Sequence, residues 1–138
     1  MHLIVVEHDL LAQIWWRNLT EETSVRLTFA DDLFAAAAIV RSKPRANTEA
    51  VVVADAERVA EAGESAWHKL RQLLACHGAR LYVYSSSIRF FALAELLGSE
   101  ADGLLRRPFG LKELTQREEQ HHRPHLPYSV TAPPPPPA

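Results

Sequence analysis

The sequence contains a single cysteine, Cys76, so the chain cannot form an internal disulfide. A lone cysteine is typical of proteins kept in a reducing compartment, and we expect a cytoplasmic location. The start of the chain, from Met1 to Glu7, has no basic segment and no apolar run long enough for a signal peptide or a membrane span. We therefore expect neither export nor insertion into a membrane.

Neither sign of charge dominates the composition. Fifteen Lys and Arg residues oppose 17 Asp and Glu residues, which gives a formal net charge of −2. The sequence thus lacks the positive excess that attracts nucleic acids or anionic membrane surfaces. Because no basic patch accompanies Trp15, Trp16 and Trp67, we interpret them as helix-packing residues rather than a platform for stacking bases.

Glycine is also scarce, with five residues, and no Gly-rich phosphate loop follows the first apolar run. A nucleophile and a base at a recognisable spacing are missing as well. These absences argue against a small-ligand enzyme of the flavodoxin-like type, and we expect that the protein is not an enzyme.

What the chain does contain is a regular alternation of short apolar runs with segments of helical periodicity. Its 138 residues, 47% of them hydrophobic, suit one domain with a single core. Five apolar runs predict strands, at 3–6, 24–29, 50–54, 81–84 and 103–105. Five periodic segments predict helices, at 10–19, about 32–41, 65–76, 88–97 and 111–120, with Asp9 and either Asp31 or Asp32 as caps.

This alternation predicts an α/β fold with a doubly wound, five-stranded parallel sheet. Ligands of such folds gather at the carboxyl ends of the strands. The side chains expected there are Glu7, His8, Asp55, Ser85 and Arg107. We expect the folded domain to span residues 1–120, and residues 121–138, rich in proline and histidine, to form a disordered tail.

Four segments occur in the order and at the spacing of a known family. They are LIVVEHD at 3–9, VVVAD at 51–55, LYVYS at 81–85 and ADGLLRRPF at 101–109. Together they resemble the receiver domain of bacterial two-component response regulators, over residues 2 to about 120. The resemblance implies the flavodoxin-like receiver topology, with strand order 2-1-3-4-5, in a cytoplasmic signalling protein.

The resemblance also implies roles for the residues at the strand ends. Asp55 would accept a phosphoryl group from a histidine kinase or a phosphotransfer protein, assisted by the Ser85 hydroxyl and by Arg107 in place of the family's lysine. A Mg²⁺ cofactor would be held by Glu7, by Asp55 and by the backbone carbonyl two residues beyond Asp55. His8 stands where the family has its second acidic residue.

Several positions depart from the family pattern. A neutral imidazole at His8 adds no negative charge, so we predict weak binding of Mg²⁺. The planar fork of Arg107 could grip the Asp55 carboxylate through two hydrogen bonds, and we predict such a pair. The rotating aromatic of many receivers is replaced by Leu104, and the proline usual shortly after the acceptor is missing from 56–59.

Two functions follow from these residues. The leading hypothesis is a single-domain response regulator, in which phosphorylation of Asp55 controls docking to a downstream protein. The alternative is a pseudo-receiver, a protein-interaction module that needs no phosphate, favoured by His8 and Arg107. The segment 88–97 carries more apolar residues than one buried face requires, so we predict an exposed patch for a downstream partner or a second copy of the chain.

Overall fold

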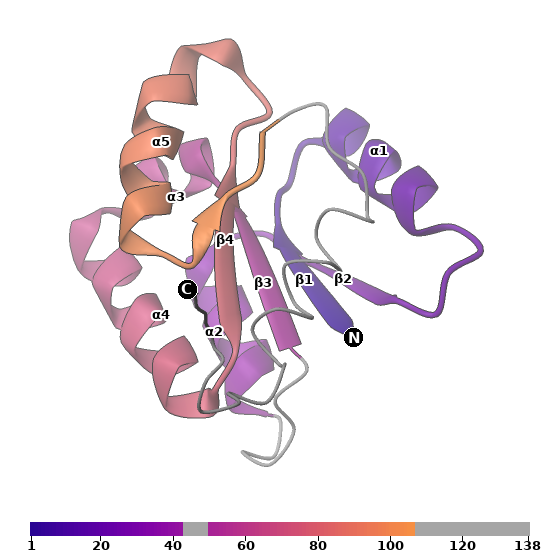
Figure 1. The fold of residues 1–138 in the computed structure, drawn as a ribbon, viewed down its shortest axis with the longest axis horizontal. Helices are drawn as coiled ribbons and strands as arrows, with labels where there is room; N and C mark the ends of the chain where they lie inside the picture. Colours follow the sequence, from indigo (N-terminus) through magenta and orange to yellow (C-terminus); the bar gives the residue numbers. More distant parts are fainter. Residues whose placement is uncertain (43–49, 107–138) are drawn as a thin grey trace, which may run out of the picture.

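The computed structural model describes residues 1–42 and 50–106, and these form a five-stranded parallel sheet with helices on both faces (Figure 1). The strands are β1 (His2–Val6), β2 (Arg26–Ala30), β3 (Ala50–Asp55), β4 (Arg80–Tyr84) and β5 (Gly103–Leu104). Their order is β2-β1-β3-β4-β5, and every neighbouring pair is parallel. The predicted doubly wound α/β fold and its strand order are confirmed.

The helices of the described ranges are α1 (Leu10–Thr20), α2 (Leu33–Arg41), α3 (Ala56–Ala62), α4 (Glu64–His77) and α5 (Phe91–Glu100), with a 3₁₀ turn, η1 (Ile88–Phe90), before α5. Four of them match predicted segments, whereas α3 was not predicted. Asp9 and Asp32 cap α1 and α2 by accepting hydrogen bonds from the backbone N–H groups of Ala12 and Ala35. The predicted helix at 111–120 and the predicted tail at 121–138 lie outside the described residues.

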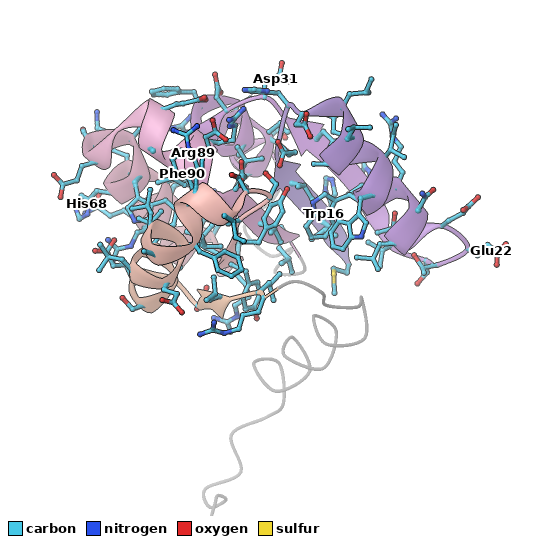
Figure 2. The ribbon with its side chains drawn as sticks, turned by 90° about the horizontal axis from the view of Figure 1, so that it is seen from above. Trp16, Glu22, Asp31, His68, Arg89 and Phe90 are labelled. Atoms are coloured by element: carbon cyan, nitrogen blue, oxygen red, sulfur yellow. The ribbon has the colours of Figure 1, made fainter. Side chains whose placement is uncertain are left out.

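The central strands are buried on both faces, as their uninterrupted apolar sequences predict. Alternate residues of β1 and β3 point to opposite sides of the sheet, so one set packs toward α1 and the other toward α2 and α4. On the α1 side, Trp16 is completely buried between its helix and the strands (Figure 2). The two cores hold the carboxyl ends of β1, β3 and β4 in fixed positions.

Helix α5 packs closely against β5, the last described strand of the sheet. Gly98 in α5 lies against Leu104, and a Cβ atom added to this glycine would be 2.9 Å from the Leu104 Cβ. The absence of a side chain at Gly98 therefore sets the spacing between α5 and β5. Within the two described ranges, none of the helices is both long and apolar enough to cross a membrane.

Candidate functional site

Three predicted site residues meet at the carboxyl edge of the sheet. Glu7 directly follows β1, Asp55 ends the neighbouring β3, and Ser85 directly follows β4. All three are buried, with exposed fractions of 1%, 1% and 3%. His8 follows Glu7, and half of its side chain is exposed. Parallel strands in register thus bring together residues that are far apart in the sequence.

The Glu7 carboxylate is held by two donors. The Tyr84 hydroxyl donates a hydrogen bond to Oε1, and the backbone N–H of Asp9 donates to Oε2 over 3.0 Å. Tyr84 is itself buried and packs edge-on against Trp16, with 5.4 Å between the ring centroids. Burial, together with the charge of Glu7, raises the pKa of the Tyr84 hydroxyl, which keeps that hydroxyl protonated as a donor.

Asp55 is held on one side by Ser86. The Ser86 backbone N–H donates to Oδ1 over 3.1 Å, and the Ser86 hydroxyl lies 3.4 Å from the same oxygen. The pKa of Asp55 is raised to about 6, chiefly by burial and also by the nearby charge of Glu7, while the Ser86 N–H and the Arg58 guanidinium act in the opposite direction. Two buried carboxylates in one pocket therefore need positive charge beside them.

Ser85 reaches the predicted edge, but its hydroxyl is used within its own turn. It donates to the backbone carbonyl of Ser87 and accepts from the Ser87 N–H over 3.2 Å. In the described structure it is Ser86 whose hydroxyl lies beside Asp55. Three consecutive serines gave no sequence signal for this choice, because the turn geometry after β4 decides which one faces the carboxylate.

Among the described residues, Arg58 supplies the cation beside Asp55, and it was not one of the predicted site residues. Its side chain is 5% exposed, and Nε lies 3.8 Å from Oδ2 of Asp55. Its Nη2 lies 3.2 Å from carboxylate oxygens of both Glu57 and Glu61. Its Nη1 contacts the His8 ring, 2.8 Å from Nδ1. One guanidinium therefore links residues that follow β1 with residues of β3 and α3.

The position of Arg58 follows from an early helix start. Helix α3 begins at Ala56, directly after Asp55, and residues three apart on a helix share a face. Asp55 and Arg58 have this spacing, as do Arg58 and Glu61. The missing proline, noted in the sequence, leaves the backbone free to enter the helix at once. Acidic residues flanking Arg58 at helical spacing were the signal that could have found the cluster.

The crystal structure of a response regulator receiver protein from Pseudoalteromonas atlantica is similar to this chain, with a TM-score of 0.54. The match covers 87% of this chain and 95% of that chain, at 18% sequence identity. This chain has the receiver fold. No protein-family model matches the sequence, and no curated protein matches it significantly. At this identity the likeness concerns the fold, so statements about chemistry rest on the residues themselves.

Within the receiver fold, Arg107 is the residue that we expected to pair with Asp55. It lies outside the described residues, so the predicted Arg107 pair stays a prediction. The arginine found beside Asp55 in the described structure is Arg58, which comes from the helix after β3 rather than from the end of the last strand.

The receiver fold also implies a Mg²⁺ site at this edge, and the residues present do not fit it. Among the described side chains, no group of three or more His, Cys, Asp and Glu converges in a way that could hold a metal ion. Both Glu7 oxygens already accept hydrogen bonds. Arg58 stands beside Asp55, where its positive charge would oppose a second cation. The described pocket therefore differs from a metal-binding receiver pocket.

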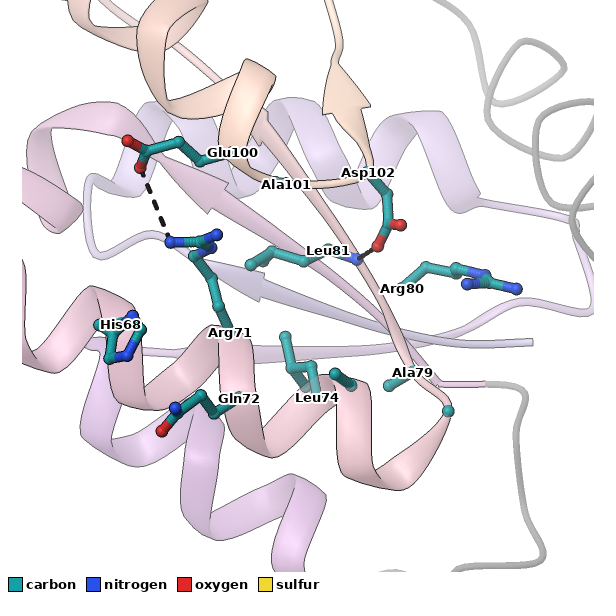
Figure 3. A pocket seen from close by; sticks show the side chains of 12 residues that line it. His68, Arg71, Gln72, Leu74, Ala79, Arg80, Leu81, Glu100, Ala101 and Asp102 are labelled. Atoms are coloured by element: carbon teal, nitrogen blue, oxygen red, sulfur yellow. Dashed lines mark hydrogen bonds and ion pairs between the residues drawn. The ribbon is translucent and has the colours of Figure 1, made fainter.

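Two hollows lie at opposite ends of the sheet. One, of about 470 Å³, is at the carboxyl edge and is lined by Glu7, His8, Asp9, Leu10, Glu57, Arg58, Ser86 and Ser87. The other, of about 480 Å³, lies between α4 and the turn before β5 (Figure 3). Its walls include an Arg71–Glu100 ion pair of 4.0 Å and the Asp102 carboxylate, which accepts from the Leu81 N–H. None of the predicted site residues lines this second hollow.

Proposed function

We propose that this domain is a pseudo-receiver, a signalling module that docks to another protein without phosphate on Asp55. The observation that carries the proposal is the closure of the Asp55 carboxylate, which is 1% exposed, held at Oδ1 by Ser86 and faced at Oδ2 by Arg58. A carboxylate that attacks phosphorus needs an accessible lone pair and cations that reach the phosphoryl oxygens. In this pocket the Asp55 carboxylate is not accessible to a phosphodonor, and the guanidinium of Arg58 already pairs with Glu57 and Glu61.

The receiver fold supports a role in two-component signalling, where such a module would meet a downstream protein or a second copy of itself. The segment formed by η1 and α5 offers exposed apolar side chains for this contact. Ile88, Phe91 and Leu96 are 83%, 43% and 60% exposed, which supports a contact through the predicted apolar segment. Exposed apolar side chains within one segment supply a candidate surface for protein association.

The decisive experiment on Asp55 is incubation with acetyl phosphate and Mg²⁺ followed by intact-mass measurement. We expect the wild-type protein to stay unmodified, while a metal-dependent receiver treated in parallel gains a phosphoryl group. The docking surface is tested separately, in the absence of any phosphodonor, by sedimentation and cross-linking. We expect Phe91→Glu to reduce self-association or partner capture. Phe34→Glu is the matched control, because Phe34 is also exposed but lies on α2.

A second candidate function is the ordinary response regulator, in which Asp55 is phosphorylated by a histidine kinase or a phosphotransfer protein with help from Ser85, Arg107 and Mg²⁺ held by Glu7 and Asp55. The position of Asp55 at the end of β3, with a serine hydroxyl 3.4 Å away, favours it. Rapid, stoichiometric phosphorylation of the wild type at Asp55 in the same mass experiment would establish this function and reject the pseudo-receiver.

A further inference from the structure

The pocket concentrates negative charge around one buried guanidinium. Glu7 and Asp55 are each 1% exposed, and Glu57 and Glu61 reach over the same group from α3. Buried carboxylates are strongly destabilising unless a cation compensates them. Arg58 supplies that positive charge, and its side chain is only 5% exposed. Because the charge is covalently part of the chain, it does not dissociate into solvent as a bound metal ion can.

Two nitrogens of Arg58 lie beside residues at positions that the receiver pattern assigns to the metal site. Nε faces Oδ2 of Asp55 and Nη1 faces the His8 ring. A guanidinium has donors and no acceptor, so the His8 nitrogen that accepts from it uses the lone pair that a metal would need. Arg58 thus lies against both His8, which stands at the family's second acidic position, and the acceptor carboxylate of Asp55.

The backbone of α3 removes a further ligand. The carbonyl two residues beyond Asp55 belongs to Glu57, which lies in the first turn of α3. Helical carbonyls point along the helix axis and accept hydrogen bonds from the residue four positions on. The Glu57 carbonyl is therefore directed into its own helix, away from a shared ion.

From these contacts we propose that Arg58 is the resident cation of the pocket and replaces the divalent metal ion of the receiver fold. The inference deepens the proposed function and rests on it, since a pocket that takes no phosphate needs no exchangeable metal. It has a specific consequence: the wild-type protein binds Mg²⁺ too weakly to saturate. Removal of the Arg58 charge lets Glu7 and Asp55 attract a divalent ion through the carboxylate lone pairs that their hydrogen bonds leave open, with Glu57 and Glu61 adding negative charge.

The test is a Mg²⁺ titration of the isolated full-length protein by calorimetry, repeated with Tb³⁺ luminescence excited through the aromatic rings beside Glu7. We expect no saturable binding by the wild type at millimolar Mg²⁺. Arg58→Gln should bind saturably, and adding His8→Asp should strengthen binding by about tenfold, because the new carboxylate brings both charge and an oxygen ligand. Arg89→Gln removes the same charge from an exposed arginine at the same edge and should behave as the wild type.

Loss of Arg58 could also prevent folding, so circular dichroism is recorded with and without the ion. A variant that folds only when Mg²⁺ is added supports the proposal, because an ion that binds the native state stabilises it. Saturable binding by the wild type as tight as by Arg58→Gln overturns it. So does an Arg58→Gln protein that gains neither affinity nor stability from Mg²⁺. Wild-type binding of Mg²⁺ without phosphorylation would reject this inference alone, whereas phosphorylation of Asp55 would reject the proposed function.

Discussion

Nε of Arg58 lies 3.8 Å from Oδ2 of Asp55, and the two side chains are 5% and 1% exposed. Neither of these two atoms has a hydrogen-bond partner within residues 1–42 and 50–106. The pair is therefore held by charge attraction without a direct hydrogen bond, in surroundings where water does not screen it. Attraction of this kind lowers the pKa of Asp55, yet burial and Glu7 outweigh it and the pKa is raised to about 6.

The raised pKa of Asp55 predicts a pH-dependent stability. Because the native carboxyl group binds its proton more readily than the unfolded one, whose pKa is near 3.8, the free energy of unfolding should fall as pH rises from about 4 to about 6 and then level off. The upper limit of this change is about 3 kcal/mol, from a rise of about two pKa units. Urea denaturation across this range measures it. Asp55→Asn should remove this part of the slope, and an unchanged slope in the variant would contradict the assignment.

Arg58 should contribute more to stability than any exposed arginine. Arg58→Gln leaves the buried Asp55 without its cation, and we expect the free energy of unfolding to fall by about 3 kcal/mol at neutral pH. Adding Asp55→Asn should recover part of the loss, because the unpaired charge is then gone, and the double-mutant cycle gives the coupling energy. Arg89→Gln is the control. Equal losses in the two arginine variants would show that Arg58 has no special role.

The Tyr84 hydroxyl is predicted to hold Glu7 in place. Tyr84→Phe keeps the ring and its contact with Trp16 but removes the donor to Oε1 of Glu7. A buried carboxylate that loses a hydrogen bond should destabilise the fold by about 1–3 kcal/mol. In Glu7→Gln the same Tyr84→Phe change should cost less, because the acceptor is no longer charged. Thermal or chemical unfolding of the four proteins measures the coupling, and strictly additive losses would argue against it.

The fold could be predicted well from the sequence because the composition of the central strands indicates that they are buried on both faces. Residues 3–6 and 50–54 are apolar without interruption, and so short a run rich in β-branched residues is typical of a strand covered on both faces. Parallel pairing then placed Glu7 and Asp55 at one edge, as the structure shows.

The details of the site were harder to predict because they depend on local turns. Helix α3 is only seven residues long, with Gly63 at its end, so its periodicity is too brief to stand out. Missing that helix meant missing Arg58, whose approach to Asp55 depends on a helix that starts at Ala56. The choice of Ser86 over Ser85 likewise depends on one turn after β4.

The contact between α5 and β5 predicts that Gly98 does not tolerate a side chain. In an exposed helix, Gly→Ala usually raises stability by about 1 kcal/mol, because alanine loses less conformational freedom on folding. At Gly98 the new Cβ would lie 2.9 Å from the Leu104 Cβ and 3.3 Å from the Leu104 Cα and N, so the backbone of β5 would have to move. We expect Gly98→Ala to lower the free energy of unfolding by about 1–3 kcal/mol, as overpacking of a filled interior does. Ser99→Ala changes the next, exposed residue of the same helix and should stay close to the wild type. Chemical denaturation of the two variants measures the difference, and a Gly98→Ala protein as stable as Ser99→Ala would mean that α5 can shift away from the sheet without loss.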